Sequence, residues 1–386
     1  MTPSDNAAAP GLAGPVMCVV GARPNFMKMA PILRALAEHV PPLPAVLVHT
    51  GQHYDASMSD RLFADLRLPR PDINLEVGSG SHAVQTAEVM KRFEPAVDER
   101  KPSCVLVVGD VNSTLACALV AVKKGVPVVH VEAGLRSGDR GMPEEINRVL
   151  TDQISGRLYT TERAALANLQ REGIAAERVC FAGNVMIDSL LDSRPAARSP
   201  AATLQAHGAD PALLDGRYGV VTLHRPSNVD DASTLEGLFS VLHEVSSQLP
   251  LVFALHPRTR ANIQKFGLDK LIDARQMVLL PPQGYLEMLG LMDKATLVLT
   301  DSGGLQEETT ALGVPCLTMR ENTERPITVE QGTNTMVGRD AQAIRDGVAA
   351  VLAGLGKRGR VPELWDGKAA ARIAADLYSW LRAGAP

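Results

Sequence analysis

Apolar runs and polar turns alternate through residues 105–152, which read VLVVGDVNSTLACALVAVKKGVPVVHVEAGLRSGDRGMPEEINRVLTD. Two runs rich in β-branched residues, at 105–108 and 126–131, are each followed by a glycine-bearing turn and a helical pattern. Strands that alternate with helices in this way pair in parallel, and helices cover both faces of the sheet. The segment therefore predicts an α/β fold with a parallel sheet.

Acidic side chains occur where these strands would end. Asp110 follows the first run, Glu132 ends the second, and Glu144 falls in the first turn of the next helix. Ligands of open α/β sheets bind outside the carboxyl ends of the strands. We therefore expect the three carboxylates to face one crevice and to take part in acid–base chemistry.

The same alternation occurs on both sides of a Pro-, Ala- and Asp-rich segment at 193–216. It predicts two doubly wound Rossmann-like domains facing each other across a cleft. Strand-like runs occupy 16–20, 45–49, 105–108, 126–131, 158–160 and 178–181, and then 218–223, 251–255, 277–280, 295–300 and 315–318. The expected division is a disordered tail over 1–15, an N-terminal domain over 16–195, a C-terminal domain over 196–365, and a helix over 366–386 that packs back on the N-terminal domain.

Composition limits the classes of function. A net charge of −4 over 386 residues gives no broad basic surface for nucleic acid. No apolar run reaches the roughly 20 residues of a membrane span, and residues 1–15 lack the basic and apolar regions of a signal peptide. The five cysteines have no CxxC spacing, which indicates reduced thiols and a cytoplasmic protein. We expect neither a nucleic-acid nor a membrane partner.

Two turns in the first half are candidate ligand sites. Gly21-Ala22-Arg23-Pro24 leads from a strand into a helix that carries Lys28, and a glycine turn at a helix start can bind an anion. The alternative is that Arg23 and Lys28 are ordinary solvated cations. Gly78–Ala83 matches GxGxxG/A, but no strand ending in an acidic residue follows it at the required distance. We interpret it as a loop, so nothing favours a nicotinamide cofactor.

Two features of the second half indicate phosphate binding. Thr300-Asp301-Ser302-Gly303-Gly304 joins a strand to a helix whose first N–H groups suit a diphosphate, although Asp301 or Ser302 could instead cap that helix. His224 also follows a strand, and the segments at 256–258 and 324–326 add further cations. No Walker A, HExxH or zinc-type spacing occurs, so the sequence requires no metal and no cofactor.

Together these segments resemble the non-hydrolysing UDP-N-acetylglucosamine 2-epimerases over nearly the whole chain. The matching segments are GARPNFMKMAPI (21–32), HTGQHYD (49–55), GDVNSTLA (109–116), HVEAGLRSGD (130–139), PEEINR (143–148), LHRPSN (223–228), DSGGLQEE (301–308) and ERP (324–326). The resemblance implies a GT-B-like fold, usually a homodimer, and inversion of C2 in UDP-GlcNAc to give UDP-ManNAc. It implies elimination of UDP to 2-acetamidoglucal and re-addition, without a cofactor.

The resemblance also implies roles for individual residues. Asp110, Glu132 and Glu144 match the catalytic carboxylates, and the face of the sugar that each one serves stays open. His224 matches a nucleotide-binding position that can also stabilise the leaving diphosphate. Gln283 is expected near the uracil. The other expected contacts to the UDP-sugar substrate are Arg23, Lys28, Ser302, Gly303, Gly304, Glu308 and Arg325.

Some positions depart from the common bacterial pattern. Asn25 replaces the usual Glu, the loop between Asp139 and Pro143 is shorter, and Pro226-Ser227 replaces an Arg-Glu pair found in members that their own substrate activates. Gln52, His53 and His256 match that allosteric site in part, so the departures argue against such activation. The open alternatives are an epimerase of UDP-2,3-diacetamido-glucuronate, a hydrolysing variant, and a GT-B glycosyltransferase, which would not need three carboxylates in its first domain.

Overall fold

The computed structural model describes residues 13–51, 56–214 and 216–384. The chain divides into two compact units, one formed by Met1–Asp192 with Glu363–Pro386 and the other by Ser193–Pro362. Each unit is built on its own parallel sheet with helices on both faces, so the prediction of two Rossmann-like α/β domains is confirmed. The expected tail lies outside the described residues as far as residue 12. No described helix is long and apolar enough to cross a membrane.

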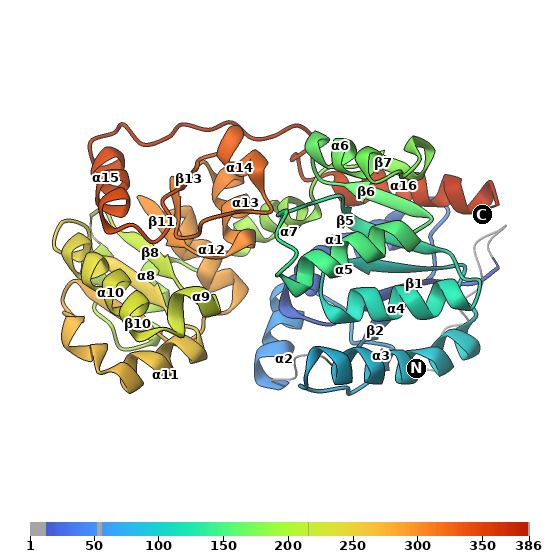
Figure 1. The fold of residues 1–386 in the computed structure, drawn as a ribbon, viewed down its shortest axis with the longest axis horizontal. Helices are drawn as coiled ribbons and strands as arrows, with labels where there is room; N and C mark the ends of the chain where they lie inside the picture. Colours follow the sequence, from blue (N-terminus) through green and yellow to red (C-terminus); the bar gives the residue numbers. More distant parts are fainter. Residues whose placement is uncertain (1–12, 52–55, 215, 385–386) are drawn as a thin grey trace. The chain divides into compact units, whose positions relative to one another are not determined.

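The sheet of the first unit has seven parallel strands in the order β3-β2-β1-β4-β5-β6-β7 (Figure 1). The strand order reverses between β1 and β4, and ligands of such sheets bind at this switch point. The carboxyl ends of β1, β4 and β5 therefore lie next to one another. The strands are β1 (Val16–Val20), β2 (Ala45–His49), β3 (Ile73–Asn74), β4 (Cys104–Val108), β5 (Val128–Ala133), β6 (Arg157–Thr160) and β7 (Val179–Phe181).

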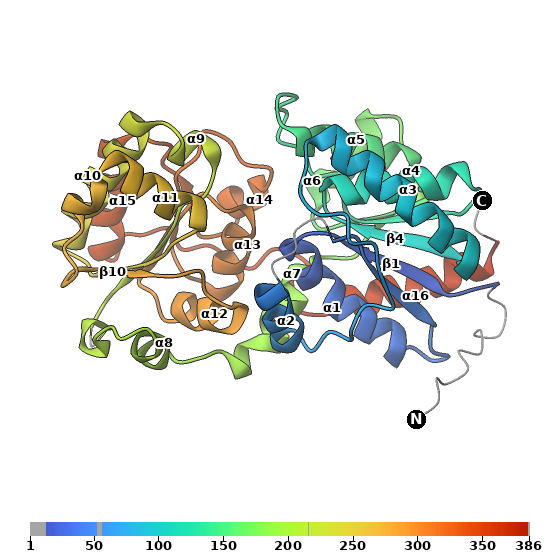
Figure 2. The same ribbon diagram turned by 90° about the horizontal axis from the view of Figure 1, so that it is seen from below.

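Helices cover both faces of this sheet (Figure 2). One face carries α3 (His82–Arg100), α4 (Asn112–Lys123) and α5 (Pro143–Ile154), and the other carries α1 (Arg23–Glu38) with α2 (Ala56–Asp65) and α16 (Ala369–Arg382) packed against it. The remaining helices are α6 (Arg163–Arg171), α7 (Val185–Ser193) and the 3₁₀ turn η1 (Ala176–Arg178). Alternate strand residues such as Met17 and Val105 pack against Phe93 of α3, as a period of two requires.

The second unit repeats this plan with six parallel strands in the order β10-β9-β8-β11-β12-β13. Its switch point lies between β8 and β11. The strands are β8 (Gly219–Thr222), β9 (Leu251–Ala254), β10 (Met277–Leu280), β11 (Leu297–Thr300), β12 (Cys316–Thr318) and β13 (Asn334–Met336). The edge strand β13 was not predicted, because three residues that begin with a buried asparagine give no apolar run.

Helices also cover both faces of this second sheet. One group packs around α10 (Ala232–Ser246) and comprises α9 (Pro226–Val229), α11 (Pro257–Phe266), α15 (Ala341–Leu352) and η4 (Leu268–Leu271). The other group packs around α12 (Tyr285–Asp293) and comprises α8 (Pro200–Ala206), α13 (Gly303–Leu312) and η2 (Arg194–Ala196). The remaining elements are α14 (Pro326–Glu330), which contacts α13, and η3 (Pro211–Leu214), which contacts α8.

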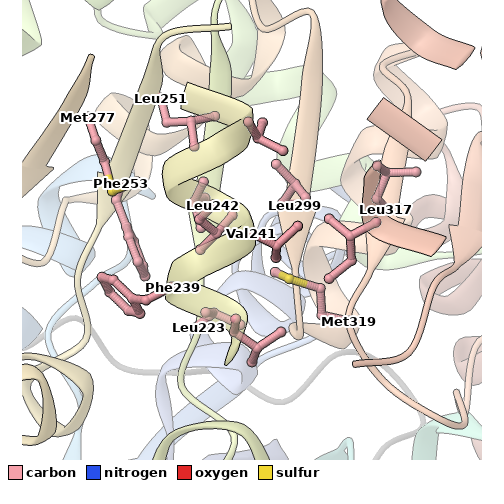
Figure 3. Packing of buried hydrophobic residues seen from close by; sticks show 14 of the residues in the cluster. Leu223, Phe239, Val241, Leu242, Leu251, Phe253, Met277, Leu299, Leu317 and Met319 are labelled. Carbon is pink, nitrogen blue, oxygen red and sulfur yellow. The ribbon is translucent and has the colours of Figure 1, made fainter. Parts of the chain in front are cut away.

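The core of the second unit lies between its sheet and α10 (Figure 3). Phe239 of α10 stacks on Phe253 of β9 with ring centroids 5.7 Å apart. Leu242, Leu299 and Leu317 complete this layer and are almost fully buried. Stacked aromatic rings and aliphatic side chains fill this interface. The polar residues of the candidate site therefore lie outside this core, at the ends of the strands.

The C-terminal helix α16 belongs to the first unit, and ionic contacts fix it there. Asp376 pairs with Arg157 through two hydrogen bonds of 2.5 and 2.8 Å and accepts a third, of 2.8 Å, from the Tyr159 hydroxyl. At the start of the helix, the carboxylate of Asp188 accepts hydrogen bonds from the backbone N–H groups of Ala369 and Ala370. Contacts between residues about 220 positions apart in sequence therefore attach α16 to β6.

We expect Asp376→Asn to lower the free energy of unfolding of the first unit by about 1–3 kcal/mol, because it weakens a largely buried bidentate ion pair. Asp366→Asn is the matched control, since Asp366 pairs with Arg372 of the same helix at the surface. Its loss should stay below about 1 kcal/mol. Guanidinium unfolding measures both, and equal losses would contradict the role given to Asp376.

Candidate functional site

A buried ion pair lies at the switch point of the first unit. Lys28 of α1 and Glu132 at the end of β5 approach to 2.6 Å between Nζ and Oε1, and their side chains are 6% and 3% exposed. Taking both charges out of water costs free energy that only close pairing and hydrogen bonding offset. The structure thus brings together two residues that the sequence predicted as site residues. Lys28 is on the helix after β1, and Glu132 is on β5, on the other side of β4.

The backbone aims Glu132 at this position. Glu132 has φ 75°, in the left-handed region that non-glycine residues rarely adopt, and the register of β5 against β6 shifts between Val131 and Ala133. A bulge of this kind turns a strand residue away from its alternating position. Left-handed residues that are not glycine store about 1–3 kcal/mol of strain and cluster at functional sites.

Gly109 brings the next strand against this ion pair. It has φ 67°, and a Cβ built on it would lie 2.9 Å from Lys28 Nζ and 3.7 Å from Glu132 Oε1. Both the backbone conformation and the lack of space require glycine here. Since Asp110 is the following residue, the turn that carries Asp110 contacts the Lys28–Glu132 pair. That Asp110, Glu132 and Glu144 all face one crevice stays a prediction.

Asp110 has its own cation, Arg148 of α5, which the sequence analysis missed. Asp110 Oδ2 lies 2.6 Å from Arg148 Nη1, and Arg148 Nη2 lies 2.8 Å from Glu145 Oε2. The Arg148 side chain is 3% exposed. The spacing of Glu145 and Arg148, one turn apart in PEEINR, was the signal that could have identified it.

The two neighbouring glutamates of α5 have different surroundings. Glu145 is buried and accepts hydrogen bonds from the backbone N–H groups of Ser137 (3.0 Å) and Gly138 (2.9 Å). Burial raises the pKa of Glu145, but these N–H groups and Arg148 outweigh it and leave the pKa below its usual value. Glu145 therefore holds the preceding loop, whereas Glu144, in the first turn of α5, is only partly buried.

The glycine turn before α1 differs from the anion site that the sequence suggested. The backbone N–H groups of Gly21 and Ala22 donate to Asn25 Oδ1, and Asn25 Nδ2 donates to the carbonyl of Val108 on β4. Two of the expected anion donors are thus occupied by a side chain. Arg23, at the first position of α1, is partly buried, and Lys28 is buried against Glu132.

In the second unit, Asp301 is the centre of the switch point. Its carboxylate accepts hydrogen bonds from the backbone N–H groups of His224 and Arg225 and from Asn228 Nδ2, and it lies 2.7 Å from His224 Nδ1. Burial raises the pKa of Asp301, but the contacts with His224 and Arg225 outweigh it and hold the pKa below its usual value. Neither Asp301 nor Ser302 caps α13 with its side chain, so the capping alternative is wrong.

Asp301 therefore orients His224, which follows β8. The ring uses Nδ1 for Asp301, so Nε2 is the nitrogen left for a ligand. The side chain of His224 is 38% exposed. The ring of His256, at the start of α11, lies 6.0 Å from it between centroids. Two of the predicted histidines thus lie together, whereas Gln52 and His53 are outside the described residues.

A cluster of arginines surrounds Glu324 next to the start of α13. Glu324 lies 2.8 Å from Arg320 Nη2 and 3.8 Å from Arg225 Nη2. Burial raises the pKa of Glu324, but the arginines around it outweigh that effect and hold the pKa well below its usual value. A Cβ on Gly303 would lie 2.6 Å from Glu324 Oε1, so this position has room only for glycine.

The remaining predicted contacts of the second unit lie around α13 and β10. Arg325 pairs with Glu307 at 2.9 Å, and both side chains are buried, as is Glu308. Ser302 and Gly304 flank the start of α13 and are partly buried. Gln283 is buried and donates to the carbonyl of Pro281. The first turn of α13 thus presents backbone N–H groups beside several arginines, which suits a diphosphate.

A family model described as UDP-N-acetylglucosamine 2-epimerase matches residues 35–378. The chain belongs to this family. The resemblance found in the sequence is therefore confirmed, and the paired carboxylates and the arginine cluster described above are features of a UDP-N-acetylglucosamine 2-epimerase family member.

Similar proteins include family members with different named substrates. UDP-N-acetylglucosamine 2-epimerase of Methanocaldococcus jannaschii is 42% identical over 339 residues, which is 86% of this chain and 91% of that protein. UDP-2,3-diacetamido-2,3-dideoxy-D-glucuronate 2-epimerase of Pseudomonas aeruginosa is 41% identical, covering 84% of this chain and 88% of that protein. The crystal structure of the M. jannaschii enzyme in complex with UDP-GlcNAc and UDP has a TM-score of 0.82 and 39% identity, covering 94% of this chain and 99% of that chain.

We expect Glu132→Gln to lower the free energy of unfolding by about 3–5 kcal/mol, because it leaves the Lys28 ammonium buried without its carboxylate. The double variant Lys28→Met/Glu132→Gln should lose less than Glu132→Gln alone. Lys124→Met is the control, since Lys124 pairs with Asp98 at the surface and should cost under about 1 kcal/mol. Urea unfolding measures these three variants and the single variant Lys28→Met, and strictly additive losses for Lys28 and Glu132 would contradict the coupling.

Proposed function

We propose that this protein is a non-hydrolysing UDP-N-acetylglucosamine 2-epimerase that interconverts UDP-GlcNAc and UDP-ManNAc. The observation that carries the proposal is the pair of carboxylates at neighbouring strand ends, each held by its own buried cation: Glu132 by Lys28 and Asp110 by Arg148. Family membership and the likeness to an epimerase in complex with UDP-GlcNAc and UDP support the same substrate.

The proposed reaction proceeds by elimination because the C2 hydrogen of a sugar is not acidic. The C1–O bond to UDP breaks, a carboxylate takes the C2 proton, and the electron pair of the C–H bond forms the C1=C2 double bond of 2-acetamidoglucal. UDP then adds back at C1 while a carboxylic acid delivers a proton to the other face of C2. We assign these transfers to Asp110, Glu132 and Glu144, since general acid–base groups of this kind contribute about 10²–10⁴ in rate.

The second unit is proposed to bind the UDP handle. His224, oriented by Asp301, stabilises the charge that develops on the leaving diphosphate, and the first turn of α13 with Gly303 and Gly304 donates N–H groups to it. Arg325 and Arg23 are further proposed contacts to the nucleotide, and Gln283 is the proposed contact to uracil. Glu308 is proposed to accept hydrogen bonds from the ribose hydroxyls.

The alternatives make different demands on the first unit. A glycosyltransferase needs an acceptor pocket, and it does not need two carboxylates that each pair with a buried cation at its sheet switch point. The P. aeruginosa relative is named for a diacetamido-glucuronate substrate, so that sugar is the second one to assay. Free UDP together with ManNAc would identify a hydrolysing enzyme.

We expect the protein to place deuterium at C2 when it is incubated with UDP-GlcNAc in D₂O, without an acceptor or an added cofactor. Asp110→Asn should slow this exchange at least about 100-fold, because it removes a proton-transferring group. Proton NMR follows the exchange, and calorimetry should give the same UDP affinity for both proteins. Asp98→Asn, on the exposed surface of α3, is the control and should exchange at the wild-type rate. Wild-type exchange by Asp110→Asn would remove Asp110 from the catalytic set.

The active form is proposed to be a homodimer that associates through the helices on one face of the first sheet. Four apolar side chains on these adjacent helices are 39–59% exposed: Val84 on α3, Val122 on α4, and Ile146 and Leu150 on α5. Large apolar side chains exposed on neighbouring helices favour an interaction surface on this face. The five free cysteines support a cytoplasmic location for this dimer, since thiols persist in reducing compartments.

We expect light scattering after size exclusion to give the mass of two chains. The double variant Ile146→Glu/Leu150→Glu should give the mass of one chain, because two charges on each copy would be buried against each other. Val40→Glu is the control, since Val40 is 87% exposed and lies outside this group of helices. A dimer that survives the double variant would place the interface elsewhere.

A further inference from the structure

A fully buried histidine lies beneath the two carboxylate-bearing turns of the first unit. His130 of β5 has no exposed surface, and both of its ring nitrogens face acceptors. Nδ1 is 2.6 Å from Asp152 Oδ1, and Nε2 is 2.8 Å from the carbonyl oxygen of Gly109. A backbone carbonyl can only accept, so Nε2 carries a proton and donates it to Gly109.

A second proton lies between the ring and Asp152, because Nδ1 and a carboxylate oxygen 2.6 Å apart need a proton between them. Asp152 Oδ2 accepts hydrogen bonds from the backbone N–H of Gly134 (3.0 Å) and from Arg136 Nη2 (2.7 Å). Burial raises the pKa of Asp152, but the charges and hydrogen bonds of His130 and Arg136 outweigh it and keep the pKa below its usual value. His130 and Asp152 thus form one hydrogen-bonded pair that has no net charge.

The charges of this network balance. Arg136 also forms two hydrogen bonds with Glu172, at 2.8 and 2.6 Å, so this ion pair lies beside a His130–Asp152 pair without net charge. A buried ionic network of this kind adds little to stability compared with well-packed apolar side chains. Since stability does not account for this network, we ask which parts of the chain its hydrogen bonds hold in place.

The hydrogen bonds of the network hold a pair of backbone groups in place. Gly109, whose carbonyl accepts from His130, immediately precedes Asp110. Gly134, whose N–H donates to Asp152, follows the left-handed Glu132 by two residues. One histidine–aspartate pair thus bonds to the chain beside both carboxylates, on two different strands.

We propose that His130 and Asp152 are positioning residues that hold the Asp110 turn and the Glu132 bulge in the relative placement that proton transfer at C2 requires. The proposal rests on the epimerase function given above. His130 and Asp152 touch backbone only at these turns and act through it, so neither is a catalytic residue. The hydrogen-bonding pattern, rather than the charge, is what the turns depend on.

Two substitutions separate hydrogen bonding from charge. His130→Leu keeps an apolar side chain in the sheet but leaves the Gly109 carbonyl without its donor. Asp152→Asn keeps every hydrogen bond: its amide donates to Nδ1 of a neutral His130, and its oxygen accepts from Gly134 and Arg136. The second change leaves the net charge of the network unaltered, so the Arg136–Glu172 pair stays balanced.

We expect His130→Leu to lower kcat for C2 epimerisation by about 100-fold, with KM and UDP affinity unchanged, because small misplacements of catalytic groups cost rates of this order. Asp152→Asn should retain a rate close to that of the wild type. Val97→Ala is the control for stability, since Val97 is buried near the C-terminal end of α3 and its side chain takes no part in the network. It should lower the melting temperature without lowering kcat.

The outcomes distinguish the proposals. A wild-type protein that exchanges no deuterium from D₂O into UDP-GlcNAc would defeat the epimerase function itself. If the wild type is active and His130→Leu turns over at its rate, the positioning role is wrong. Equal losses of kcat in His130→Leu and Val97→Ala would reduce His130 to a packing residue, and a large loss in Asp152→Asn would show that the charge matters instead.

Discussion

The buried ion pair between Lys28 and Glu132 constrains the whole switch point of the first unit. It joins α1 to β5 across β4, so the turn after β4 has to pass beneath it. Only a glycine fits in that turn, because a Cβ on Gly109 would collide with the ammonium group. The position of Asp110 then follows from Gly109, and that of Arg148 follows from Asp110. Each step is a packing or charge requirement imposed by the one before.

Charge is held differently at the two switch points. In the first unit Glu132 and Asp110 each lie against a buried cation, Lys28 and Arg148, which suits the proton transfer proposed for them. In the second unit the carboxylates serve the cations and the histidine: Asp301 fixes His224, and Glu324 lies among arginines. Asp301 and Glu324 thus hold the histidine and the arginines in place. This division matches a reaction in which one half moves protons and the other holds a diphosphate.

Much of this organisation could be predicted from the sequence, because parallel strands give continuous apolar runs and their turns give glycine and polar residues. The fold class and the adjacency of Asp110 and Glu132 followed from strand ends alone. Arg148 and Asp301 could not be assigned, since an arginine inside a helix and an aspartate before one have ordinary surface explanations. The Asn25 bonds to Gly21 and Val108 depend on tertiary packing, which the glycine turn by itself does not reveal. The strand β13 was not predicted, because its three residues do not form an apolar run.

The docking of α16 makes the first unit discontinuous in sequence, with the second unit inserted between residues 192 and 363. The ribosome therefore synthesises the whole second unit before it synthesises α16, the last helix of the first unit. The inserted unit can complete its folding first. The surface of α1 that α16 covers stays exposed until the last residues leave the ribosome. A premature stop near the end of the message would thus damage the first unit, whose sheet was translated long before, and spare the second unit, which is translated later.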